Sequence, residues 1–294
     1  MLLKIQLHIY CLLSLMVSCS SFANFQPLIN FGDNPGELTA SYFQLAKSSS
    51  SIVVLLHGCV QNGEELALQS GFVELAKQHH FTLLIPQQSQ NNNVKSCFNW
   101  FSDQDSSKDQ GEVLSIKNMI LALKAQTKIN HVYIAGLSAG GAMTSALLVH
   151  YPQLFSAGAV VAGLPYPCAN NLAKAISCMR NGPSQSTDEL ANLAKESNKS
   201  IKAWPKLLVI TGNDDLVVSP KNSTSLALQW AKITTSELQE EKKSLVNYQE
   251  RLGVNKRGEQ QVKLITIDNI GHGISVNPTH KDRDSSSVFY LNRH

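Results

Sequence analysis

A serine flanked by glycines lies near the middle of the chain, where residues 136–140 have the sequence Gly-Leu-Ser-Ala-Gly. An apolar run, 132–135, precedes this segment, and an Ala- and Gly-rich helical pattern follows it. A serine hydroxyl is a poor nucleophile unless the backbone holds it beside a base, and a sharp strand-to-helix turn does this. Gly136 and Gly140 lack the Cβ atoms that would collide in so tight a turn. The pattern predicts that Ser138 is the nucleophile of a serine hydrolase.

A nucleophilic serine needs a base, and the base needs an acid that orients it. In α/β-hydrolases these residues follow the chain order serine, acid, histidine, each beyond the carboxyl end of a strand. His272 lies between two glycines after the last predicted strand, and Asp214 and Asp215 follow the strand before it. We expect His272 to be the base and Asp215 to be the acid, with Asp214 as the alternative acid. Asp268 is a less favourable acid because it lies so near His272 on the same loop.

The negative charge that develops on a carbonyl oxygen during attack needs hydrogen-bond donors that are already in place. The backbone N–H of Ala139, at the start of the predicted helix, is one candidate. The second is the N–H of Cys59, in the loop after the first central strand. His57 lies in the same loop, and we expect it to hold that loop rather than to act as a base or metal ligand.

The first 23 residues have the features of a signal peptide. Lys4 gives a positive start, an apolar stretch covers about 9–17, and Ser-Phe-Ala at 21–23 offers a cleavage site. The stretch is too short to span a bilayer comfortably, so no transmembrane segment is expected in the mature chain. An imperfect lipoprotein box ending at Cys19 leaves acylation open as an alternative. The expected location is therefore the periplasm or the outside of the cell.

Cysteine usage fits export. Two of the six cysteines lie in the leader, and four remain: Cys59, Cys97, Cys168 and Cys178. In an oxidising compartment four cysteines predict two disulfides, with three possible connectivities. A local bridge between Cys168 and Cys178 is favoured by their closeness in sequence, which leaves Cys59 to pair with Cys97. The chain has no Cys-x-x-Cys or histidine cluster that would predict a metal site, and the net charge of +3 forms no basic stripe that would predict nucleic-acid binding.

Apolar strand patterns alternate with helical patterns along the chain, which predicts an α/β fold: a mostly parallel sheet with helices on both faces, in one domain spanning 24–294. The expected strands are 38–45, 52–56, 81–85, 132–135, 157–161, 207–210 and 262–267. The expected helices are 64–77, 113–123, the segment after Ser138, one helix in a polar surface insertion at 181–203, and 226–246. A polar Gln/Asn-rich loop is expected at 87–96.

Several segments together resemble the esterase family that includes extracellular short-chain-length poly(3-hydroxybutyrate) depolymerases, with feruloyl and acetyl-xylan esterases as relatives. They are residues 31–36, 56–61, 97–101, 136–143 and 162–166, the cysteines at 168 and 178, the pattern Gly-x-x-Asp-x-x-Val-x-Pro-x-Asn at 212–222, and Gly-His at 271–272. The resemblance implies an α/β-hydrolase that uses no metal or cofactor and cleaves esters through an acyl-enzyme. It also implies the triad Ser138, Asp215 and His272, and it favours Asp215 over Asp214.

Departures from the family pattern bear on the substrate. Phe98 stands where the family often has tryptophan, and the segment after His272 lacks a Trp-Pro pair that many members carry. The length leaves no room for a linker and separate polymer-binding domain, so the catalytic surface is expected to bind a polymer, with Trp100 and Trp204 as candidate contacts. Poly- or oligo-(3-hydroxybutyrate) is the expected substrate. The alternatives are feruloyl or acetyl esters of polysaccharide and, in another class, a non-catalytic envelope-anchored binding protein with a relict site.

Overall fold

The computed structural model describes residues 24–45, 50–126, 129–199, 201, 203–241 and 247–275. The expected signal peptide, 1–23, and Cys19 within it lie outside these residues. In the part of the chain described, no helix combines the length and the apolar character needed to cross a membrane.

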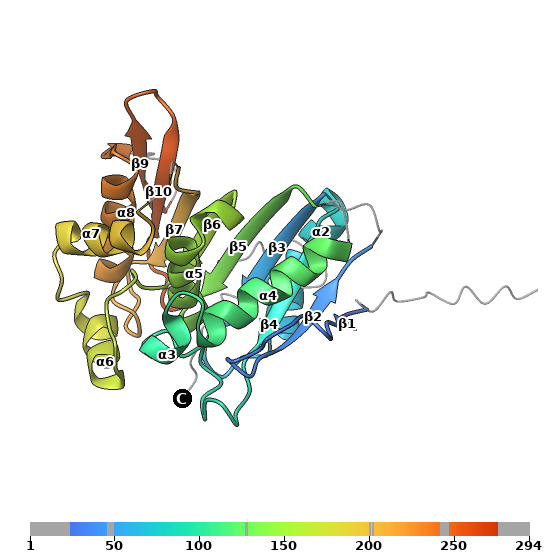
Figure 1. The fold of residues 1–294 in the computed structure, drawn as a ribbon. Coiled ribbons are helices and arrows are strands. Elements are labelled where there is room, and N and C mark those ends of the chain that lie inside the picture. The colour runs from blue at the N-terminus through green and yellow to red at the C-terminus, as the bar shows by residue number, and fades with distance from the viewer. Residues whose placement is uncertain are drawn as a thin grey trace, which may run out of the picture.

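The described residues form one ten-stranded sheet in the order β1-β2-β4-β3-β5-β6-β7-β10-β9-β8 (Figure 1). The central strands from β4 to β10 are parallel, and the pairings at both edges are antiparallel. The strands are β1 Gln26–Pro27, β2 Thr39–Phe43, β3 Ser51–Leu56, β4 Thr82–Gln87, β5 His131–Leu137, β6 Ala157–Val161, β7 Lys206–Gly212, β8 Ser236–Glu241, β9 Tyr248–Asn255 and β10 Gln260–Ile267. Continuous apolar runs form the parallel strands because such strands are buried on both faces.

Helices cover both faces of the sheet, and each face has its own apolar layer. Val54 and Leu56 of β3 contribute to the larger layer, under α4, α5, α7 and α8, whereas Leu55 contributes to the smaller layer under α1 and α2. The helices are α1 Gly63–Gln69, α2 Phe72–His79, α3 Asp103–Ser106, α4 Gly111–Gln126, α5 Ala139–His150, α6 Leu172–Asn181, α7 Thr187–Ser197 and α8 Pro220–Ile233, with a 3-10 turn, η1, at Pro152–Leu154. The expected α/β fold with a mostly parallel sheet and helices on both faces is confirmed.

Three expectations about single elements are wrong. The helix expected at 64–77 is two helices, α1 and α2, because Gly71 adopts a left-handed φ of +82° between them. The helix expected at 226–246 ends at Ile233, and the charged segment after it pairs as β8 with β9, a strand not expected at all. The stretch 181–203 is not a surface insertion, because α7 buries Leu190, Ala191 and Ala194 in the larger apolar layer or beside it.

Candidate active site

Ser138 lies at a sharp turn between β5 and α5. Its backbone has φ 58° and ψ −119°, a sparsely populated conformation for a residue with a side chain. A Cβ added at Gly136 would lie 2.2 Å from the carbonyl oxygen of Gly140, and one added at Gly140 would lie 2.4 Å from that of Leu56. The turn therefore requires both glycines, and it holds the serine at the carboxyl end of β5.

The structure brings together the three side chains that the sequence predicts to act together. The Nε2 atom of His272 lies 2.9 Å from the Oγ of Ser138, and its Nδ1 lies 2.7 Å from the Oδ2 of Asp215. All three residues are buried. With Nδ1–H donating to the carboxylate, Nε2 is left to accept the hydroxyl proton. This arrangement is able to activate the serine oxygen as a nucleophile.

The other oxygen of Asp215 fixes the carboxylate in the loop after β7. Its Oδ1 accepts hydrogen bonds from the N–H groups of Val217 (2.9 Å) and Val218 (2.8 Å). Asp214 is exposed. The Oδ1 of Asp268 accepts from the side chain of Asn213 (3.2 Å). Of the three candidate acids, Asp215 is the one beside His272.

Asn213 joins the acid loop to the histidine loop, a role that the sequence analysis missed. Its N–H donates to Ile267 O (2.9 Å), and its Oδ1 accepts from the N–H of Asn269 (2.8 Å). Gly212 lies so close to the same loop that a Cβ there would be 2.0 Å from Ile270 O. These contacts hold the two loops at a fixed distance, although they are far apart in the chain. The available signal was the position of an asparagine directly after a strand, where such residues bond to backbone groups.

The candidate oxyanion loop packs directly on the start of α5. Gly140 has no room for a Cβ because the carbonyl oxygens of Leu56 and His57 lie against it. Within the described residues, the N–H groups of Cys59 and Ala139 make no hydrogen bond. Both are therefore free to donate, and the N-terminal end of α5 adds a favourable dipole for an anion.

Both cysteine pairs expected from the spacing are bonded in the structure. The Cys59–Cys97 bridge ties the oxyanion loop to the Gln/Asn-rich loop after β4. The Cys168–Cys178 bridge closes the segment that leads into α6. Asn222 continues this second connection, since its side chain donates to Cys178 O (2.8 Å) and Ser219 O (3.2 Å) and so joins α6 to the acid loop.

His57 is a buried structural residue. Its Nε2 accepts from the N–H of Gln88 (3.1 Å), its Nδ1 donates to Gly58 O (2.7 Å), and its ring lies 4.8 Å from that of Phe98. Phe98, where the family often has tryptophan, is itself fully buried. Burial lowers the pKa of His57 to about 4, the hydrogen bond to Gly58 opposing this effect. The ring is therefore neutral around pH 7 and holds the loop in place.

Acidification is expected to destabilise the fold through His57. Its pKa is about 4 in the folded state and near 6.5 in an unfolded chain. Between these values only the unfolded state takes up the proton, so the free energy of unfolding falls as the pH falls, by on the order of 3 kcal/mol over the full window. Urea unfolding at pH 7, 5.5 and 4.5 should show a shallower pH dependence for His57→Gln than for the natural chain. Equal slopes in the two proteins would contradict this assignment.

The two tryptophans expected to contact substrate are not placed to do so. Trp100 is buried in the larger apolar layer with Phe98 and offers no exposed ring face. Trp204 is half-buried near the start of β7, and its ring packs 5.9 Å from that of Trp230. Trp204 precedes the amino-terminal end of the parallel strand β7, whereas Ser138 lies beyond the carboxyl end of the parallel strand β5. The two residues are therefore at opposite ends of the parallel strands. The expectation that Trp100 and Trp204 contact substrate is therefore wrong.

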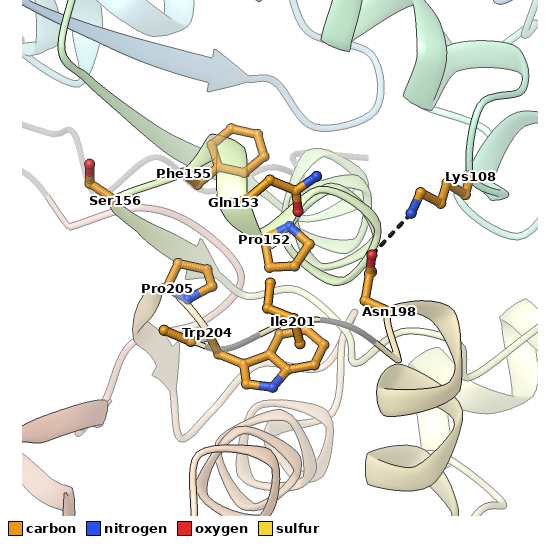
Figure 2. Close-up of a pocket in the computed structure, with 10 residues that line it drawn as sticks. Lys108, Pro152, Gln153, Phe155, Ser156, Asn198, Ile201, Trp204 and Pro205 are labelled. Carbon is orange, nitrogen blue, oxygen red and sulfur yellow. Dashed lines mark hydrogen bonds between the residues drawn. The ribbon is translucent and has the colours of Figure 1, made fainter.

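Trp204 lines a cavity of about 610 Å³ at the amino-terminal ends of β6 and β7 (Figure 2). Pro152, Phe155 and Ile201 share the lining, and the Nζ of Lys108 donates to the Oδ1 of Asn198 (3.0 Å) across one side. None of the proposed catalytic residues is in this lining. The cavity is separate from the candidate active site.

The model of the esterase PHB depolymerase family matches residues 43–237, about two thirds of the chain. The chain belongs to this family. The match includes Ser138 and Asp215, and His272 lies beyond its end.

Individual relatives are esterases and depolymerases by name. The chain is 34% identical to poly(3-hydroxyalkanoate) depolymerase C of Paucimonas lemoignei over 90% of its own length and 65% of that protein's length. It is 28% identical to feruloyl esterase B of Talaromyces funiculosus over 72% and 62% of the two chains. The solved acetyl xylan esterase of Aspergillus awamori has the same fold, with a TM-score of 0.75, 21% identity and coverage of 85% of this chain and 94% of that one.

Proposed function

We propose that this chain is a serine esterase that cleaves poly- or oligo-(3-hydroxybutyrate) through an acyl-enzyme. The observation that carries the proposal is the hydrogen-bonded series Ser138, His272 and Asp215 at the carboxyl edge of the sheet. Membership of the esterase PHB depolymerase family supports the ester as the bond attacked. The name of the Paucimonas relative supports a 3-hydroxyalkanoate as the substrate class.

In the proposed mechanism, His272 Nε2 takes the proton of Ser138 as the hydroxyl oxygen attacks the ester carbonyl. Asp215 keeps the imidazole in the required tautomer and stabilises its charged form. The N–H groups of Cys59 and Ala139 bind the oxyanion. His272 then protonates the leaving alcohol, and a water molecule activated by the same imidazole releases the acyl group and restores the serine.

Exposed aliphatic side chains on the loops around the serine support a polyester substrate. Leu216, next to Asp215, is 95% exposed, and Val60, next to Cys59, is also exposed. The N–H of Val60 donates to Lys95 O (2.7 Å), and Val94, one residue before Lys95, is exposed as well. Aliphatic side chains exposed on the loops that carry Cys59 and Asp215 are available to bury apolar groups of a substrate. A polyester with a methyl group in every unit and no free hydroxyls offers such groups along its whole length, whereas a polysaccharide offers mainly hydroxyls.

Parallel release assays test the proposal. The mature chain is expected to release 3-hydroxybutyrate from oligomers and from a polymer film, and to release little ferulate or acetate from substituted xylan. Leu216→Ser should lower release from the film roughly fivefold by weakening adsorption, with kcat/KM for a soluble butyrate ester unchanged. Leu121→Ser, at a 45% exposed position on α4, is the matched control. Preferential release of ferulate or acetate would replace the polyester with a polysaccharide ester.

The proposal includes export of the chain by residues 1–23, with residues 24–294 as the catalytic domain. The two disulfides are compatible with an oxidising compartment. Acylation of Cys19 remains the alternative route to the envelope. The mass of the mature N-terminus distinguishes cleavage after residue 23 from a lipid-modified cysteine.

A further inference from the structure

A buried glutamate outside the proposed triad, Glu112, lies at the start of α4. Glu112 is 0% exposed, and among the described residues its side chain accepts hydrogen bonds from the side chains of Gln88, Asn92 and Asn99 and from the Asn99 backbone. Its Oε2 accepts from the N–H of Asn99 (2.9 Å), and its Oε1 accepts from the side chains of Asn99 (2.8 Å) and Gln88. Burial raises the pKa of Glu112 to about 8, and the hydrogen bonds from Asn99 and Gln88 oppose this shift. Glu112 thus fastens both ends of the Gln/Asn-rich loop after β4 to one helix.

Two series of contacts connect the Glu112 side chain to the candidate oxyanion loop. In the first, Gln88 donates its backbone N–H to His57, whose Nδ1 bonds to Gly58 O, one residue before Cys59. In the second, the Gln88 side chain donates to Cys97 O (3.2 Å), and Cys97 is bonded to Cys59 through its sulfur. The position of the Cys59 backbone therefore depends on the loop that Glu112 holds.

We propose that Glu112 is a positioning residue for the oxyanion hole, keeping the Cys59 N–H in place through Gln88 and the Cys59–Cys97 bridge. The inference rests on the proposed function. Oxyanion donors stabilise a transition state only when their position is fixed before the reaction, because a donor that must reorganise loses much of its effect. Glu112 does not itself touch substrate. Its removal should therefore affect the chemical step more than substrate binding.

The test compares kcat and KM for a soluble butyrate ester among three variants. Glu112→Ala removes one of the two acceptors of the Gln88 side-chain amide and the acceptors of the Asn99 backbone and side-chain N–H groups. The kcat should fall about a hundredfold, the lower end for loss of one oxyanion donor, with KM changed less than threefold. Glu112→Gln keeps an amide oxygen for the side chains of Gln88 and Asn99, and should lose less than tenfold. Inactivation by a fluorophosphonate should slow in parallel with kcat.

Ser115→Ala is the matched control for a buried polar change on the same helix. The Ser115 hydroxyl accepts from the N–H of Gly36 (2.9 Å) and donates to Gly111 O (3.0 Å), so it makes no contact with the oxyanion loop. This variant should lose thermal stability while keeping its kcat. If Glu112→Ala fails to fold, Glu112→Gln decides: a twofold to tenfold lower kcat supports the proposal, and an unchanged kcat overturns it. If the natural chain itself shows no esterase activity in this assay, the result contradicts the proposed function instead.

Discussion

Replacing Ser138 by alanine is expected to lower kcat/KM for soluble butyrate esters by about four to six orders of magnitude, as loss of the nucleophile does in serine hydrolases. The alanine methyl group fits the space of the serine side chain, and the turn is formed by Gly136 and Gly140, whose backbone contacts stay the same. The melting temperature should therefore change little. Initial rates and thermal unfolding of the purified variant measure the two quantities.

Ser145 provides the control for this substitution because it is a buried serine in α5, the helix that begins directly after Ser138. Its hydroxyl donates to Gly141 O (3.3 Å), within α5. Ser145→Ala should keep its activity within about threefold, since the substitution removes only a local hydrogen bond. A Ser138→Ala variant that still hydrolyses the ester at a rate comparable to the natural chain would remove Ser138 from the mechanism.

Replacing Asp215 by asparagine is expected to lower kcat by about a factor of 10⁴, the effect seen when the acid of a triad is converted to its amide. An amide nitrogen in place of Oδ2 would face the Nδ1–H of His272, now 2.7 Å away, and two donors repel. Relief of this contact favours the other tautomer of the ring, which places a proton on Nε2. That nitrogen can then no longer accept the serine proton, and KM should change far less than kcat.

Asp214 offers a matched control one residue away. It carries the same charge and is exposed, so Asp214→Asn should leave kcat within about twofold. The pair of variants distinguishes the loss of a positioned carboxylate from the loss of a negative charge near the site. Equal losses in the two variants would contradict the assignment of Asp215 as the acid.

The local patterns that predicted the site depend on covalent spacing and on strand polarity. Gly136 and Gly140 predicted the turn at Ser138, because a Cβ atom at either position would collide with a neighbouring backbone carbonyl oxygen. The order serine, acid, histidine predicted the meeting of Ser138, Asp215 and His272, because parallel strands bring their carboxyl ends to one edge. The central strands were predicted well for a related reason, since a strand covered on both faces needs an unbroken apolar run.

The errors lie where tertiary contacts decide the outcome. The charged segment after Ile233 has a helical pattern, yet residues 236–241 pair with β9 because that strand offers an open edge. From the sequence, Trp100 and Trp204 could each lie at the surface or in the core. Tertiary packing buries Trp100 in the core and places Trp204 at the ends of the parallel strands that lie away from Ser138. The role proposed for Glu112 could not be predicted from the sequence either, because its partners Gln88 and Asn99 reach it only when a polar loop folds.

The most direct test of the central claim is to label the folded natural chain with a fluorophosphonate probe and to map the adduct by peptide mass spectrometry. The probe reacts with a serine only when a base and oxyanion donors activate it. The account predicts one adduct, on Ser138. It forms in the native protein, does not form when the chain is unfolded in urea before labelling, and forms much more slowly in Asp215→Asn. A folded chain that leaves Ser138 unlabelled, or that carries the adduct on another residue, would contradict it.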